Sequence, residues 1–220
     1  KKILFQMENC ICKIYLKINE IGKGFLCKFY IYNNVIPVLI TYSNILNYID
    51  NNKIIMLNIN NEIKEIKIDN SRKIMHDKNK DIAIIEIKPN KDKIYKYLEL
   101  DENYIYQNEK NIEIENKRRD IYIIYYQNEE VNVSYDLINE IGNIKYINYY
   151  YKIEEGSFCS PILSLKTFKI IGIYYVNSQN IKLYYGILFK NLIDEFDENK
   201  NEMNIIYKTD KEGEDYIFGD

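Results

Sequence analysis

Residues able to carry chemistry are few in this chain. His76 is the only histidine, and it stands five residues before Asp81. A histidine titrates near neutral pH, so it can serve as a general base or an acid-sensitive contact, although an exposed loop histidine without a role is the commoner case. The four cysteines include no pair with the spacing of zinc ligands: Cys10, Cys12, Cys27 and Cys159. The sequence therefore predicts no metal centre, no cofactor, and buried reduced thiols.

One run has the form of a tight loop that leads into a strand. It covers Glu155–Leu163, begins with Gly156 and closes with Ser160 and Pro161 before an apolar strand. Phe158 stands at the centre of this run, and a phenyl ring has no nucleophilic atom.

Two earlier segments carry further parts of the same pattern. Residues 22–46 read Gly-Lys-Gly-Phe, then a strand, then Leu-Ile-Thr followed by Asn44. Residues 80–87 contain Asp81 at the head of Asp-Ile-Ala-Ile-Ile. Together with the loop around Phe158, these segments resemble the trypsin-like serine proteases, whose base, acid and nucleophile follow in this chain order. The resemblance places Asn44, Asp81 and Phe158 at those three positions.

The resemblance runs from about Cys10 to Phe196 and implies a fold. We expect an all-β protein of two six-stranded antiparallel β-barrels packed together, with a short C-terminal helix and an acidic tail. The expected domain covers residues 1–196, with one barrel at about 9–100 and the other at about 118–190. Residues 197–220 form the expected tail.

The same resemblance implies lost catalysis. Asn44 is neutral and cannot accept a proton near pH 7, and Phe158 has no nucleophilic atom. The backbone N–H groups of Gly156 and Phe158 would still form an oxyanion hole, because they do not depend on side chains. Asp81 would then be a structural carboxylate, hydrogen-bonded to Asn44 or to backbone. We therefore expect a pseudoprotease that binds a peptide or protein, or serves as a structural part.

Three other residues border the expected cleft. Cys159 follows the nucleophile position by one residue, so its side chain should point away from the cleft and be a buried thiol. Tyr174 lies in a stretch that replaces the small residues lining the specificity pocket, so that pocket is expected to be filled. His76 lies in a loop that borders the cleft in this family. It leaves open an alternative, a repurposed hydrolase such as a cyclic-dinucleotide nuclease or a residual protease.

Composition agrees with an all-β domain. Tyr occurs 23 times and Ala83 is the only alanine, so strand formers are rich and the best helix former is nearly missing. An AT-rich genome explains the same excess of Lys, Asn, Ile and Tyr. The formal net charge of −3 gives no support to nucleic-acid binding.

The ends of the chain give further expectations. Residues 1–8 lack the apolar stretch of a secretory signal, and no run has membrane-spanning length. With the low cysteine count, this favours an intracellular, cytoplasmic protein. From Asp194 onward acids outnumber bases, which is typical of a solvated tail, or else of an autoinhibitory or docking tail.

Periodicity and turn residues predict the individual elements. An Asn60-Asn61 turn should join two strands as a hairpin. Residues 91–98 have helical spacing, and 110–119 are the expected connection between the barrels. The strands are expected at 11–16, 24–31, 36–42, 53–59, 62–68, 81–87, 120–126, 131–137, 144–150, 161–164, 168–176 and 181–189, with a closing helix at 191–196.

Overall fold

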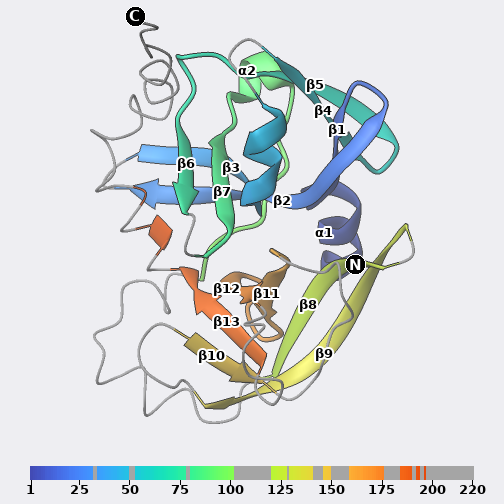
Figure 1. The fold of residues 1–220 in the computed structure, drawn as a ribbon. Coiled ribbons are helices and arrows are strands. Elements are labelled where there is room, and N and C mark those ends of the chain that lie inside the picture. The colour runs from blue at the N-terminus through green and yellow to red at the C-terminus, as the bar shows by residue number, and fades with distance from the viewer. Residues whose placement is uncertain are drawn as a thin grey trace, which may run out of the picture.

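The chain folds into two antiparallel β-sheets that pack against each other (Figure 1). This confirms the expected all-β fold. The computed structural model describes residues 1–31, 34–49, 53–77, 80–101, 120–127, 129–140, 146–149, 159–175, 184–189, 192–193 and 196. The expected connection at 110–119 and the acidic tail lie outside these residues.

The first sheet has seven strands in the order β5-β4-β1-β2-β3-β7-β6. Each neighbouring pair is antiparallel. Asn60 and Asn61 both have positive φ, 48° and 66°, which confirms the predicted hairpin turn between β4 and β5. The strands are β1 (Ile11–Leu16), β2 (Asn19–Ile31), β3 (Asn34–Tyr42), β4 (Ile54–Ile59), β5 (Glu62–Lys67), β6 (Ile74–Asp77) and β7 (Ile82–Glu86).

The second sheet is a closed barrel in the order β10-β13-β12-β11-β8-β9. It has the six strands that were expected, each within a few residues of its predicted range. They are β8 (Asp120–Gln127), β9 (Glu130–Glu140), β10 (Tyr146–Tyr149), β11 (Pro161–Ser164), β12 (Ile170–Tyr175) and β13 (Tyr184–Leu188).

Helical segments are short and lie at the margins of the sheets (Figure 1). They are α1 (Lys2–Cys10), the 3-10 helix η1 (Ser43–Tyr48) and α2 (Pro89–Asp92). Of the expected closing helix, Leu192, Ile193 and Phe196 are described, and all three are helical and buried. No described helix is long and apolar enough to cross a membrane.

Helix α1 was not predicted, and it connects the two sheets. The Gln6 side chain is buried, donates to the Phe168 carbonyl at 2.7 Å and accepts from the Tyr122 hydroxyl at 2.6 Å. Cys10 at the end of the helix is fully buried. Because Ile3, Met7 and Cys10 recur at helical spacing, the sequence did carry this signal.

A single apolar core joins the sheets. Phe25 and Phe29 of β2 meet Phe189 at ring-centroid distances of 6.3 and 5.5 Å, and Phe196 contacts Phe29 edge-to-face at 5.3 Å. Ile84 of β7 and Tyr122 of β8 belong to the same core, so both sheets contribute to it. A second core lies inside the first sheet and includes Leu26, Leu39 and Ile85. The two faces of β2, β3 and β7 are therefore both buried, which explains their nearly continuous apolar sequences.

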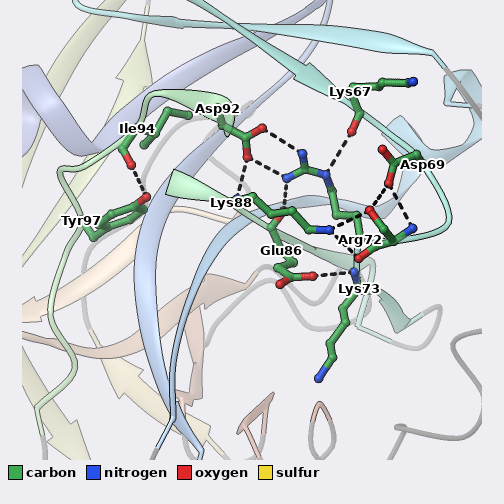
Figure 2. Close-up of polar contacts among 10 residues, drawn as sticks. Lys67, Asp69, Arg72, Lys73, Glu86, Lys88, Asp92, Ile94 and Tyr97 are labelled. Carbon is green, nitrogen blue, oxygen red and sulfur yellow. Dashed lines mark hydrogen bonds and ion pairs between the residues drawn. The ribbon is translucent and has the colours of Figure 1, made fainter. Parts of the chain in front are cut away.

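A buried ion pair between Arg72 and Asp92 links strands that lie at opposite ends of the first sheet's strand order (Figure 2). The Arg72 guanidinium donates to both carboxylate oxygens of Asp92, at 2.7 and 2.8 Å. It also donates to the carbonyl of Lys67 on edge strand β5 at 3.1 Å, and to that of Glu86 on β7 at 2.5 Å. The Lys88 backbone N–H donates to Asp92 at 2.7 Å. Arg72 thus bridges β5 to the far side of the sheet, where β7 and β6 lie.

Two expectations about the first sheet were wrong. His76 lies in strand β6 rather than in a loop, and this short strand brings the sheet to seven strands instead of six. Residues 91–98 are not a helix beyond Asp92, because Lys93 has left-handed backbone with φ 55° and ends α2. Leu98 then pairs with Cys27 of β2 as an isolated bridge.

Close packing explains why glycines occupy positions 22 and 24 of the Gly-x-Gly-Phe segment. A Cβ atom at Gly24 would lie 2.5 Å from the carbonyl oxygen of Ile40, and one at Gly22 would lie 2.8 Å from Ile45 Cγ2. Gly24 pairs with β1 on one side and with Thr41 of β3 on the other. Glycine is needed there because a backbone atom occupies the space of any side chain.

Substitution Asp92→Asn should lower the free energy of unfolding by about 3 kcal/mol, because it leaves the Arg72 guanidinium buried without a counter-charge. Urea unfolding followed by circular dichroism measures this. Glu62→Gln is the matched control, since the Glu62–Lys64 pair is exposed and should leave the midpoint unchanged. Equal midpoints for the two variants would contradict the role assigned to Arg72.

Substitution Gly24→Ala should destabilise the protein more than Gly22→Ala. The added methyl group meets a backbone carbonyl at position 24 but the end of an isoleucine side chain at position 22. We expect a loss of about 2 to 4 kcal/mol for Gly24→Ala, on the scale of overpacked cores, and about 1 kcal/mol for Gly22→Ala. Thermal unfolding of the two variants gives the order, and the reverse order would contradict this explanation.

Candidate functional site

Asp81 lies immediately before β7, at the end of the first sheet where β3 leads into η1. Its backbone is left-handed, with φ 52°, and its side chain is exposed. Its carbonyl accepts from the Ser43 backbone N–H at 2.9 Å, and its carboxylate accepts from the Ser43 hydroxyl at 3.5 Å. Ser43 therefore holds both the backbone and the side chain of Asp81.

Asn44 follows Ser43 on η1 and is exposed, whereas its neighbours Ser43 and Ile45 are buried. The structure thus brings Asn44 to the end of the sheet where Asp81 lies. The hydrogen bond expected from Asn44 to the Asp81 carboxylate comes from Ser43 instead. The sequence pattern gave no signal for Ser43, because its contact with Asp81 joins segments that are far apart in the chain.

Cys159 approaches from the second sheet. Its thiol is buried in the core that both sheets share, as expected for a structural cysteine. Burial, and to a smaller extent the negative charge of Asp81, together raise its pKa to about 12. Ile82, which follows Asp81, belongs to the same core as Cys159, so Asp81 and Cys159 lie near each other at the junction of the sheets. Gly156 and Phe158, the other expected residues of this loop, lie outside the described residues.

The backbone around Cys159 is tightly packed. Cys159 has φ 60°, a conformation that glycine adopts more easily than other residues. The cavity beside it has a volume of only about 10 Å³, room for about one water molecule. Its described lining comes from both sheets: Ile11, Lys23, Gly24, Ile124, Tyr125, Tyr126, Cys159, Ser160 and Pro161.

Tyr174 of β12 is 1% exposed and is one of the largest fully buried side chains. Its backbone N–H donates to the Ser160 carbonyl at 2.8 Å, which fixes β12 to the loop that carries Cys159. Its Cα partner on β13 is Gly186. A tyrosine ring therefore fills interior space next to this loop, and the filled specificity pocket stays a prediction.

The His76 side chain lies on the face of β6 that is turned away from the junction of the sheets. Neighbouring residues on a strand point to opposite faces, and Met75 and Ile84 lie in the core between the sheets. His76 pairs with Ala83 and shares its face with Ile74, which lies in the core inside the first sheet. His76 is half-buried there and is directed away from the side that faces Cys159.

The other cysteines are also buried. Burial raises the pKa of Cys10 to about 12 and raises those of Cys12 and Cys27 as well. Within the described residues, no group of three or more His, Cys, Asp or Glu side chains could hold a metal ion. Among the described residues, the junction thus contains the exposed Asp81 carboxylate and Asn44 amide near the buried, protonated thiol of Cys159.

Comparison with solved structures identifies the architecture. The serine endoprotease of Yersinia pestis superposes with a TM-score of 0.59 at 12% identity, over 90% of this chain and 65% of that chain. The serine protease domain of the Sesbania mosaic virus polyprotein gives 0.57 at 14% identity, over 84% of this chain and 90% of that one. The chain has the chymotrypsin-like fold.

A third chymotrypsin-like structure is a catalytically inactive tobacco etch virus protease complexed with substrate. It superposes with a TM-score of 0.52 at 13% identity, over 86% of this chain and 83% of that one. The sequence matches no protein-family profile and no curated protein. The likeness is therefore one of fold, and this chain spans less than two thirds of the Yersinia chain's length.

All four native thiols should resist alkylation in the folded protein. At pH 8 a thiol with a pKa raised to about 12, such as those of Cys10 and Cys159, is almost wholly protonated and also shielded from the reagent. Iodoacetamide labelling followed by mass spectrometry should give no adduct without urea and four adducts in urea. The variant Ile18→Cys is the positive control, because position 18 is 91% exposed. Rapid native labelling of Cys159 would show a reactive thiol.

Proposed function

We propose that this chain is a non-catalytic homologue of the chymotrypsin-like proteases that binds a peptide or protein where its two sheets meet. The observation that carries the proposal is the pairing of Asp81 with Ser43. The carboxylate that orients a catalytic base in this fold is held here by a serine hydroxyl, and the next residue is Asn44. An amide cannot take a proton from a nucleophile near pH 7.

The nucleophile position supports the same proposal. Phe158 occupies it in the sequence pattern, and a phenyl ring has no atom that can attack a carbonyl. Cys159, the nearest thiol in sequence, is buried and has a raised pKa. The thiolate is the reactive form, so this environment suppresses a displaced cysteine nucleophile.

Binding does not require the groups that are lost. Turnover depends on interactions with the transition state, whereas ground-state binding depends on shape and backbone hydrogen bonds. The inactive tobacco etch virus protease, by its description, still holds a substrate. A ligand of the present chain would lie against exposed Asn44 and Asp81. Because Tyr174 fills the interior beside the loop, such a ligand would not insert a large side chain there.

The alternative nuclease activity receives no support from His76. That histidine is directed to the inner core of the first sheet and not to the junction. A phosphodiester hydrolase that used it would have to bind its substrate at a different surface.

Purified protein should neither cleave peptide libraries nor react with a fluorophosphonate serine probe, because the described site lacks a base and an accessible nucleophile. The double variant Asn44→His, Phe158→Ser should stay far below an active protease, since Cys159 and Tyr174 also differ from the pattern. Heat-denatured protein is the control for probe labelling. Labelling or turnover above that control in the wild type would refute the loss of catalysis.

Binding is tested with a random peptide library displayed on phage. Selected peptides should bind the wild type and be recovered uncleaved. Asn44→Arg should weaken them by about tenfold, because it places a bulky charge in the expected ligand space. Asn19→Arg, at the exposed first residue of β2, is the matched control and should leave affinity unchanged. If Asn44→Arg leaves the affinity of the selected peptides unchanged, the binding surface lies elsewhere.

A further inference from the structure

A second concave surface lies on the first sheet, away from the junction. It is a groove with a volume of about 410 Å³, which falls in the range of ligand-sized sites. The start of β3 forms one side, and the end of β7 with the start of α2 forms the other. The described lining residues are Val35, Ile36, Pro37, Glu86, Ile87, Lys88, Pro89, Asn90 and Lys91. We refer to it below as the β3–α2 groove.

This groove is separate from the candidate site. Asp81 precedes β7, whereas Glu86 ends it, and five residues of extended chain span about 16 Å. Likewise β3 begins at the groove and ends beside Ser43. An occupant of the groove would therefore leave the junction of the sheets free.

The groove has an apolar floor and a cationic rim. Val35 is 51% exposed, a high value for an aliphatic side chain on a sheet. Lys88 directs its ammonium group to the Ser71 carbonyl and hydroxyl, at 2.6 and 2.7 Å. The Glu86 carboxylate already accepts from the Lys73 backbone N–H at 2.9 Å. Lys91 is exposed, and within the described part of the chain it makes no ion pair. The surface therefore suits a segment that combines acids with apolar side chains.

The chain itself has such a segment, and it departs from beside the groove. Phe196, the last described residue, is buried and packs edge-to-face on Phe29. Phe29 is the Cα partner of Ile36, which lines the groove. The polypeptide therefore leaves the shared core on the same pair of strands that begins the groove.

The composition of residues 197–220 matches the surface. Acids outnumber lysines along this stretch, and near its end Glu212, Glu214 and Asp215 come directly before Tyr216-Ile217-Phe218. Three adjacent apolar side chains after a run of acids could bury against the floor while the carboxylates face the exposed ammonium group of Lys91. The function proposed above makes no use of this segment.

We propose that residues 210–220 dock in the β3–α2 groove of their own chain. About twenty residues separate Phe196 from Tyr216, and an extended linker of that length spans roughly 60 Å. Phe196 already packs on Phe29, whose Cα partner Ile36 lines the groove, so the linker is long enough to reach it. Tethering to the same chain gives the segment an effective concentration of the order of millimolar, so even a weak contact is occupied. The acidic tail is then an internal ligand of the first sheet.

The full-length variant Gly219→Cys tests this, because the buried native thiols leave the new cysteine as the site for a nitroxide spin label. Paramagnetic broadening of backbone amide signals should concentrate on Ile36, Ile87 and Lys91. Amides around Tyr135, on β9 of the second sheet, should be unaffected. Broadening absent from the groove, or concentrated on another surface, would overturn the proposal.

Matched substitutions in the labelled protein establish the chemistry. Val35→Asp and Lys91→Glu should each reduce groove broadening, with Lys91→Glu lowering the docked population by about fivefold. Ile63→Asp, at a side chain 53% exposed, and Lys166→Glu, at an exposed lysine, are the controls and should leave it unchanged. The amide spectra show whether each variant is folded. Equal effects of rim and control variants would contradict docking at this groove.

A mixed sample identifies the occupant. Spin-labelled protein without isotope is added to isotope-labelled protein without a spin label, so that broadening reports only contacts between molecules. We expect none. Broadening of the groove in this sample would assign the site to the tail of a second copy and refute docking within one chain. Neither result bears on the peptide binding that we propose at the junction.

Discussion

Burial of one apolar core between the two sheets is the constraint on which the rest of the structure depends. The face of β2 that carries Phe25 and Phe29 is too apolar to be exposed to water. The second sheet and the described residues after β13 therefore cover it. The edge-to-face contacts of Phe29 with Phe189 and Phe196 add about 1 kcal/mol each beyond burial. This packing fixes the relative position of the sheets, and the nearness of Asp81 to Cys159 follows from it.

The groups that maintain this architecture are different from those that perform hydrolysis in it. Arg72 and Asp92 span the first sheet, and Gln6 links α1 to the second sheet through Tyr122. None of these residues belongs to the expected triad positions. Replacing a base or a nucleophile at those positions would therefore cost this fold little. The binding function that we propose for the junction would need no change in these structural contacts.

Most of the fold was predictable because strand-forming residues and turn residues agree along the chain. The hairpin at Asn60-Asn61 is the clearest case, since both residues adopt the positive φ that the pair permits. Strand β6 was missed because four residues are too few to show alternation, and His76 was therefore assigned to a loop. Arg72 could not be recognised, because its partners become neighbours only through tertiary contacts. For the same reason Ser43 carried no signal in the sequence.

The backbone at Cys159 has a strained conformation that burial of its own side chain maintains. A left-handed conformation costs a residue with a Cβ about 1 to 2 kcal/mol relative to glycine. Cys159 adopts it with φ 60°, and burial of its thiol in the shared core offsets that strain. Tyr174 is likewise held by the bond from its backbone to Ser160. The described part of this loop is therefore set by burial of the Cys159 thiol and by the hydrogen bond between Tyr174 and Ser160. Substitutions at positions 44 and 158 leave these two contacts in place, which is why we expect the double variant to stay inactive.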